Sequence, residues 1–170
     1  MKKLGNLSQQ AIETDCSVLR NESDVEQRVL YPFFVSGMFM GYDPSWVLTQ
    51  EFCAAATIGK GAKKREGYKP DYMISIAGFP LLICEAKEPN VRVDIAISEA
   101  RLYAAEINAR YPTNSNPISI AVGSNGIEIA ISPADSVETE VFKIADLNPS
   151  SSALQEVQEL IGSELSLIHI

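Results

Sequence analysis

The stretch PDYMISIAGFPLLICEAK, residues 70–87, determines the fold expected for this chain. Two apolar runs, YMISIA and LLIC, lie on either side of a Gly-Phe-Pro segment. Short apolar runs around a Gly/Pro turn are typical of an antiparallel hairpin. Because Asp71 and Glu85 lie equally far from Gly78 in the sequence, we expect them to face each other across this hairpin.

The end of this hairpin brings three ionisable residues together. Side chains alternate along a strand, so Lys87 leaves the second strand on the same face as Glu85. Two facing carboxylates repel each other unless a cation lies between them. Mg²⁺ is typically bound by one or two carboxylates together with waters and a substrate phosphate. We therefore expect Asp71 and Glu85 to be metal ligands and Lys87 to stabilise developing negative charge in phosphodiester hydrolysis.

The net charge of −8 argues against a general electrostatic attraction to nucleic acid. One window is nevertheless basic and lies directly before the hairpin. It contains five of the 14 basic residues: Lys60, Lys63, Lys64, Arg65 and Lys69. The window is interpreted either as a solvated loop or as a phosphate contact.

A first helix is expected from Glu22 or Ser23, because Ser23 followed by Glu26 has the form of a capping box. Glu22 and Glu26 are four residues apart and share a helix face that can point toward a site at the edge of the helix. Pro32 predicts a kink or a break in this helix.

The remaining elements alternate between strand and helix patterns, which indicates an α/β fold. Residues 46–52 form a strand or a short helix, and periodicity does not decide between them. Residues 118–122 and 127–131 predict a second hairpin around an Asn-Gly turn, and residues 152–164 a last helix. Residues 93–109 predict a helix with these buried positions: Ile95, Ala96, Ala100, Leu102, Tyr103 and Ile107.

Length and composition fit one domain of 170 residues, 46% of them apolar. No apolar run is long enough to span a bilayer, so we expect a cytoplasmic protein that does not bind membranes. The three cysteines lack CxxC spacing and are expected to be reduced. The single histidine, His169, excludes a histidine-based triad or zinc site.

Several of these stretches together resemble a known family. They are NESDVEQ (21–27), LYP (30–32), YKPDY (68–72), ICEAKEP (83–89) and AVGSNGIEI (121–129). The order is similar to the N-terminal nuclease domain of type I restriction enzyme R subunits and of related predicted type IV-like restriction endonucleases. The resemblance covers a core of about residues 20–145, with the last helix following it.

This resemblance implies the PD-(D/E)xK fold, a mixed central sheet flanked by helices, and cleavage of double-stranded DNA in restriction-modification defence. It implies Mg²⁺ as the cofactor, with Mn²⁺ as a substitute. The family's catalytic positions fall on Asp71, Glu85 and Lys87, and its acidic residue on the first helix falls on Glu22 or Glu26. Many relatives carry a glutamine four residues before the tyrosine that corresponds to Tyr103, an expected nucleic-acid contact. Here that position is Glu99, whose carboxylate can bond to substrate or to Lys87.

In complete restriction enzymes this domain precedes an ATP-driven translocase and is joined to methylation and specificity subunits. No GxxxxGK[ST] phosphate loop occurs in this sequence. The chain is then either part of a larger protein or a small stand-alone relative. Two alternatives to a nuclease remain: a catalytically silent domain that binds nucleic acid or a partner, and a structural domain in which Asp71 caps a turn and Glu85 and Lys87 mark the solvated end of a strand.

Overall fold

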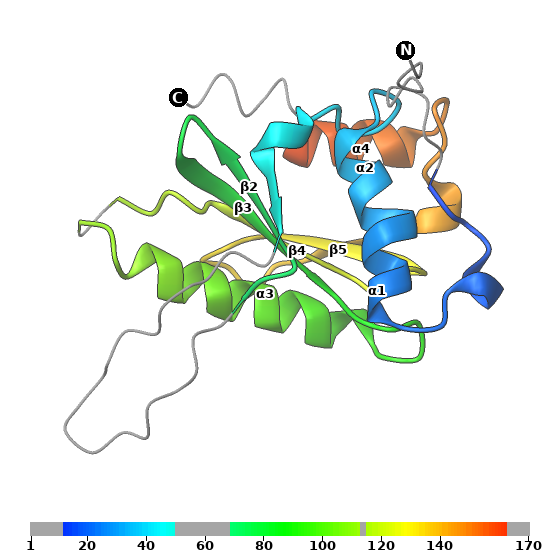
Figure 1. Ribbon diagram of the computed structural model, residues 1–170, viewed down its shortest axis with the longest axis horizontal. Helices are drawn as coiled ribbons and strands as arrows, with labels where there is room; N and C mark the ends of the chain where they lie inside the picture. Colours follow the sequence, from blue (N-terminus) through cyan, green and yellow to red (C-terminus); the bar gives the residue numbers. More distant parts are fainter. Residues whose placement is uncertain (1–11, 50–68, 113–114, 163–170) are drawn as a thin grey trace, which may run out of the picture.

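A computed structural model describes residues 12–49, 69–112 and 115–162 of the protein (Figure 1). In this part of the chain, six strands form one sheet in the order β1-β2-β3-β4-β5-β6. The strands are β1 (Val47–Thr49), β2 (Tyr72–Ile76), β3 (Phe79–Ala86), β4 (Ile120–Ser124), β5 (Glu128–Pro133) and β6 (Glu140–Lys143). Only the β3–β4 pair is parallel among them, so the sheet is mixed, as expected.

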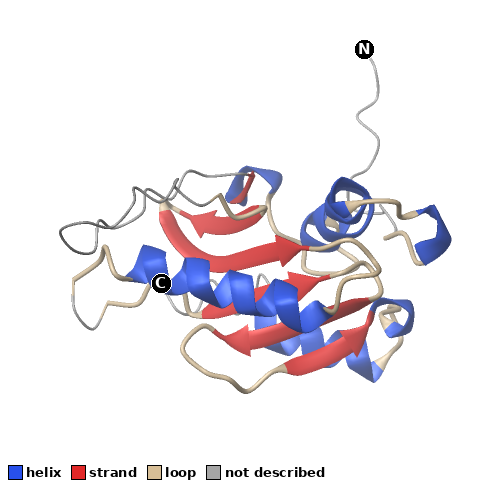
Figure 2. Ribbon diagram, turned by 90° about the horizontal axis from the view of Figure 1, so that it is seen from below, coloured by secondary structure: helices blue, strands red, loops and turns tan. Residues whose placement is uncertain are grey.

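Helices cover both faces of the sheet (Figures 1 and 2). They are α1 (Glu22–Val25), α2 (Tyr31–Val35), α3 (Val93–Asn108) and α4 (Ser152–Ile161). α3 lies on one face, and α1, α2 and α4 lie on the other. Parallel neighbours need a crossover connection, and α3 supplies it between β3 and β4. No helix among the described residues has the length and apolar content needed to cross a bilayer.

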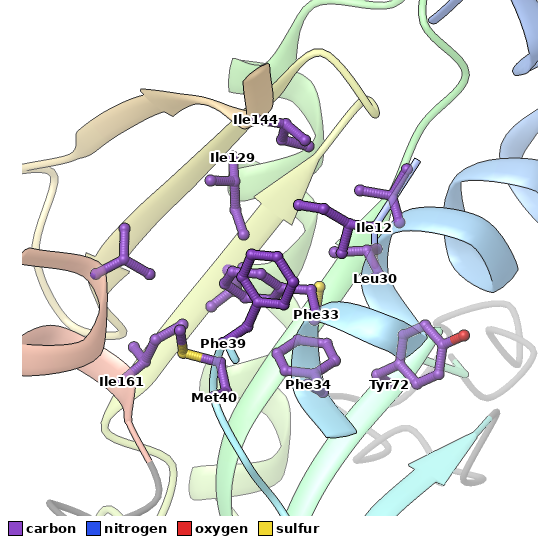
Figure 3. Close-up of a cluster of buried hydrophobic side chains, with 14 of the residues drawn as sticks. Ile12, Leu30, Phe33, Phe34, Phe39, Met40, Tyr72, Ile129, Ile144 and Ile161 are labelled. Carbon is purple, nitrogen blue, oxygen red and sulfur yellow. The ribbon is translucent and has the colours of Figure 1, made fainter. Parts of the chain in front are cut away.

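The core is divided between the two faces. The larger cluster includes Phe33, Phe34 and Phe39 (Figure 3), with the rings of Phe33 and Phe34 edge to face at a centroid separation of 5.5 Å. The smaller cluster packs α3 against the sheet through residues such as Ile83 and Ile97. Alternation along β3 explains the division, because Ile83 faces α3 while its neighbours face the aromatic cluster.

The helix expected at 93–109 is present, but of its expected core residues Tyr103 is only half-buried and two others are exposed. Ile95 is 45% exposed and Leu102 is 44% exposed. Both lie on the side of α3 that faces away from the buried positions, such as Ala100 and Ile107. Apolar residues occur around much of α3, so hydrophobicity alone identified the wrong members of the buried face.

The β2–β3 hairpin is present, and a bulge sets its register. Its turn consists of Ala77 and Gly78, both with positive φ (52° and 84°). This two-residue turn pairs Ile76 with Phe79, and a regular ladder from that pair would bring Cys84 opposite residue 71. A register shift after Ile74 leaves one extra residue, Leu81, on β3, so that Tyr72 pairs with Cys84. Residue 71 therefore lies opposite residue 85, as predicted, but because of the bulge rather than the turn.

The first helix begins at Glu22, but the expected capping box is wrong. Asn21 is the N-cap, and its side chain accepts a hydrogen bond from the Asp24 N–H at 2.9 Å. The Asp24 carboxylate in turn accepts one from the Arg20 N–H at 2.9 Å. Ser23 is thus inside the helix, two positions after the residue that caps it.

Pro32 neither breaks nor ends this helix. A π-helical segment, Glu26–Leu30, joins α1 to α2, and the Tyr31 N–H bonds to the Glu26 carbonyl. Proline has no N–H to donate to the carbonyl four residues earlier. That carbonyl, of Arg28, accepts the N–H of Glu13 at 2.9 Å instead.

The other expected elements are present with small changes. A 3₁₀ turn (Pro44–Trp46) leads into β1, and residues 50–52 of the undecided segment lie outside the described residues. β4 and β5 form the second expected hairpin, and β6 extends the sheet without having been predicted. α4 ends at Ile161, before the expected residue 164, because Gly162 is extended with ψ 152°.

Candidate active site

Asp71 and Glu85 meet at the ends of the two central hairpin strands, and both are buried. The backbone N–H of Asp71 donates to Glu85 Oε1 at 3.3 Å. The N–H of Ala86 donates to Asp71 Oδ2 at 2.7 Å. Each carboxylate is therefore held by the backbone of the opposite strand, and the strand ends fix the position of both.

Because both carboxylates are buried, it is unfavourable for Asp71 and Glu85 to be charged at the same time. Burial raises the pKa of Glu85 to about 9, and the charge of Asp71 adds to the rise. Burial also raises the pKa of Asp71, although the hydrogen bond from Ala86 opposes it. Neighbouring buried carboxylates need either a proton or a cation to neutralise them.

Lys87 supplies a positive charge beside them. Its Nζ lies 2.8 Å from Glu99 Oε2, 3.5 Å from Glu85 Oε2 and 3.6 Å from Glu22 Oε2. Burial lowers the pKa of Lys87, but the bond to Glu99 and the charges of Glu85 and Glu22 outweigh it, so the net shift is upward. Lys87 therefore stays protonated at neutral pH.

The first helix brings both of its glutamates to the site. Carboxylate oxygens of Glu22, Glu26 and Asp71 all lie within 4.8 Å of one another. Burial, with the charges of Asp71 and Glu22, raises the pKa of Glu26 to about 7. The Tyr72 hydroxyl fixes this part of the helix by donating to the Glu26 carbonyl at 3.0 Å. The sequence left open whether Glu22 or Glu26 is the fourth member of the site, and the structure places the carboxylates of both beside Asp71.

α3 adds Glu99 and Tyr103 from the opposite face. Glu99 bonds to Lys87, which is one of the two roles expected for a carboxylate at that position. Burial raises the pKa of the Tyr103 hydroxyl to about 12, and the charges of Glu85 and Glu99 add to the rise. Tyr103 is half-buried, and the charges of the site residues act on its hydroxyl.

The structure describes only part of the basic window that precedes the hairpin. Lys60, Lys63, Lys64 and Arg65 lie outside the described residues. Lys69 is described and exposed, two residues before Asp71. The expectation of phosphate contacts from this window stays a prediction.

The donor set suits a hard divalent cation. Among the described residues, Glu22, Glu26 and Asp71 form a group of carboxylates close enough to share one ion, and Glu85 is linked to it through Asp71. Mg²⁺ and Mn²⁺ favour such oxygen ligands. The expected ligand pair, Asp71 and Glu85, stays a prediction, and the geometry adds Glu22 and Glu26 as candidate ligands.

Sequence reasoning missed the part of the site's surroundings formed by Ser124 and Asn125. The Ser124 carbonyl accepts the Lys87 N–H at 2.8 Å. Ser124 and Asn125 are both buried. The signal available in the sequence was the Asn-Gly pair at 125–126. It correctly indicated a turn, but periodicity does not reveal which other segments a turn contacts.

Comparisons with known proteins support the same architecture. Residues 44–135, more than half of the chain, match the family model described as type I restriction enzyme R protein N terminus. Among solved structures, the chain is similar to a fragment assigned to the HsdR subunit of a type I restriction enzyme from Vibrio vulnificus YJ016, with a TM-score of 0.52 and 20% identity. That match covers 82% of this chain and 25% of the other, so this chain spans a quarter of its length. No curated protein that was compared matches the chain.

Proposed function

Because the chain belongs to the family of type I restriction enzyme R protein N-terminal domains, we propose that it is a metal-dependent endonuclease acting on double-stranded DNA. The chain is a restriction-enzyme nuclease-type domain with a restriction-endonuclease-like fold. The proposal goes further by assigning the reaction, hydrolysis of phosphodiester bonds, and the residues that perform it.

The observation that carries the proposal is the convergence of Asp71, Glu85 and Lys87 on one buried patch, with two further carboxylates beside them. Such a patch is costly for stability alone, because buried like charges repel and remain desolvated. A site that must bind a cation and a phosphate accounts for that cost. The structural alternative, in which these residues mark a solvated strand end, does not fit side chains as buried as Asp71 and Glu85.

The residues divide the chemistry between them. Asp71 and Glu85, with Glu22 or Glu26, would hold Mg²⁺ or Mn²⁺, which supplies Lewis-acid activation of the phosphate and of the attacking water when bound. The Lys87 ammonium is placed to orient the water or to stabilise negative charge that develops on the phosphate. Glu99 keeps that ammonium in place.

The rest of a restriction enzyme belongs to the same proposal. In such an enzyme the domain would work with a translocase and with methylation and specificity subunits. The complex would act on foreign DNA in the cytoplasm. Sequence preference would then come from those partners and not from this domain.

Plasmid cleavage by the purified chain tests this function. We expect nicking or linearisation with Mg²⁺ or Mn²⁺, none with EDTA, and none with Asp71→Ala or Lys87→Ala. Calorimetric titration with Mn²⁺ should show binding that Asp71→Ala removes and that Glu159→Gln, at an exposed position on α4, leaves unchanged. Metal-dependent cleavage that persists in purified Asp71→Ala protein contradicts the proposal.

One observation favours a second candidate function. Three carboxylates surround Lys87, and one of them, Glu99, stands at the position where the family resemblance implies a neutral glutamine. A site with this excess of negative charge repels phosphate in the absence of a cation. DNA retention without cleavage under Mg²⁺, Mn²⁺ and Ca²⁺ would favour a silent, DNA-binding domain.

A further inference from the structure

One four-residue segment, which we call the 123–126 turn, consists of the last two residues of β4 (Gly123 and Ser124) and the first two of its connection to β5 (Asn125 and Gly126). It contacts each of the three segments that carry the site residues. These segments are the end of β3 with Lys87, helix α3 with Glu99, and helix α1 with Glu22. They are far apart in the sequence. What holds them in a common geometry decides whether the site can work.

The first contact fixes Lys87. β4 runs parallel to β3, with Ala86 paired to Ser124, and the Ser124 carbonyl accepts the Lys87 N–H at 2.8 Å. Asn125 fixes the loop that follows, because its Nδ2 donates to the Val91 carbonyl at 2.9 Å. Its Oδ1 accepts the N–H of Glu128 at 2.8 Å, which closes the turn. Asn125 is only 5% exposed, so its amide is committed to these bonds.

The second contact seats α3. Gly123 is paired with Glu85 across the parallel ladder. A Cβ on Gly123 would lie 2.4 Å from the Ile97 nitrogen, closer than side-chain and backbone atoms can approach. α3 can therefore pack at this distance only over a glycine. Ile97 is two residues before Glu99, so the height of α3 above the sheet sets how far Glu99 is from Lys87.

The third contact seats α1. Gly126 has φ +81°, and a Cβ there would lie 2.6 Å from Leu19 Cδ1 and 3.0 Å from Val25 Cγ2. Val25 lies between Glu22 and Glu26 on the helix. Any shift of Val25 away from this turn moves both carboxylates relative to Asp71.

We propose that the 123–126 turn is the positioning element of the active site, holding the segments of Lys87, Glu99 and the two α1 glutamates in register. This inference rests on the proposed function for its catalytic consequence, but the placement itself is a property of the fold. Asn125 and Gly126 touch no substrate in this proposal and act through the residues they hold.

Asn125→Asp tests the first contact with a matched control in the same chain. Asn108 makes a comparable clamp elsewhere, with Nδ2 donating to the Ile118 carbonyl at 2.8 Å and Oδ1 accepting the Ile118 N–H at 2.9 Å. Each aspartate keeps the acceptor and loses the donor. We expect Asn125→Asp to lower kcat about 10-fold or more with KM for DNA little changed, because small misplacements of catalytic groups are costly. Asn108→Asp should leave kcat within about 3-fold at equal loss of Tm.

Gly126→Ala tests the third contact and has a control of its own. Gly78 has almost the same φ, +84°, but an added Cβ there meets nothing within 4 Å. Gly78→Ala therefore reports the backbone strain alone, and Gly126→Ala reports strain plus pressure on Leu19 and Val25. We expect only Gly126→Ala to lower kcat.

Carboxyl ¹³C chemical shifts of Glu22 and Glu99 separate this inference from the proposed function. We expect Asn125→Asp and Gly126→Ala to move these signals, and the two control variants to leave them in place. Equal loss of kcat in the test and control variants at matched Tm overturns the inference. If the wild-type chain does not cleave DNA, the proposed function fails, but the carboxyl shifts still test the positioning role. Unmoved signals in both test variants overturn that role, and moved signals support it.

Discussion

Glu99 Oε2 lies 2.8 Å from Nζ of Lys87, the shortest of the three ion pairs that this lysine makes. Glutamine at position 99 would keep an acceptor for the ammonium and remove one negative charge from the site that we propose binds phosphate. We predict that Glu99→Gln lowers KM for DNA about 2- to 5-fold, with kcat within about 3-fold of wild type. Glu99→Ala removes the acceptor as well and should lower kcat about 10-fold. Steady-state cleavage at several salt concentrations measures both, and loss of all activity in Glu99→Gln would show that the carboxylate itself is needed.

Without metal, the folded protein should lose stability as pH rises. The pKa of Glu26 is raised to about 7 and that of Glu85 to about 9, both from an ordinary 4.5, so the folded state holds protons that the unfolded state releases. Their contribution is complete below pH 4.5 and is lost as pH rises through about 7 for Glu26 and about 9 for Glu85. Tm measured in EDTA should fall between pH 5 and 9, and added Mn²⁺ should flatten the fall. A Tm that rises with pH over this range contradicts the assignment.

Neutralising Glu85 should raise the stability of the metal-free protein and abolish its activity. Burial raises the pKa of Glu85 to about 9, so at pH 8 folding requires this carboxyl to take up a proton that the unfolded state has released. Glu85→Gln removes that requirement, so we predict a higher Tm at pH 8 in EDTA, by about 2–4 °C for each kcal/mol gained. The same variant should lose metal-dependent cleavage, because a candidate ligand is gone. Glu159→Gln on the exposed side of α4 should change neither quantity. A lower Tm for Glu85→Gln at pH 8 would contradict the raised pKa of Glu85.

Glu26 should bind metal more readily than Glu22. Glu22 already lies 3.6 Å from Lys87 Nζ, whereas no ion pair within the described ranges involves Glu26. We predict that Glu26→Gln weakens Mn²⁺ binding more than Glu22→Gln does, by about 10-fold in Kd against about 3-fold. Calorimetric titration at pH 8 compares them. The reverse order would assign the third ligand to Glu22.

Arg101 should contribute to stability and not to cleavage. Its guanidinium donates to Ser132 Oγ at 2.8 Å, to the Val137 carbonyl at 3.3 Å and to the Thr139 hydroxyl, which ties the β5–β6 connection to α3. We predict that Arg101→Met costs about 1–3 kcal/mol, because several hydrogen bonds to a charged donor are lost. Limited proteolysis should then cut the connection at residues 134–139 faster.

Arg92→Met is the matched control for Arg101→Met. Arg92 pairs with Asp94 at 2.7 Å, but its side chain is 82% exposed. Pairs of this kind contribute about 0–1 kcal/mol. Equal destabilisation by the two substitutions would show that the hydrogen bonds of Arg101 stabilise the protein no more than an exposed ion pair does.

The sequence was sufficient for the central part of the fold. The apolar runs around residues 78–80 identified the β2–β3 hairpin, and the acidic ends of those runs identified the pair that meets there. The Asn-Gly turn located the β4–β5 hairpin in the same way. These features depend on local pattern, which a single sequence displays directly.

What the sequence did not provide depends on packing. The bulge on β3 has no local signature, yet it decides which residue lies opposite Asp71. Ile95 and Leu102 are as apolar as the residues that α3 buries, and only the position of the sheet distinguishes them. Glu22 and Glu26 share a face of the helix, so the sequence could not separate them, and the packed helix brings both of them to Asp71.

The bulge at residue 81 also divides the hairpin into two parts with separate registers. Towards the site, Ile83 pairs with Met73 and with Ala121, so neighbouring strands hold that part on both sides. Beyond the bulge, the turn at Ala77 and Gly78 determines only the pairing of residues 75 and 76 with residues 80 and 79. This turn is therefore a place where a dye or an epitope can be grafted while the spacing of Asp71 and Glu85 is kept.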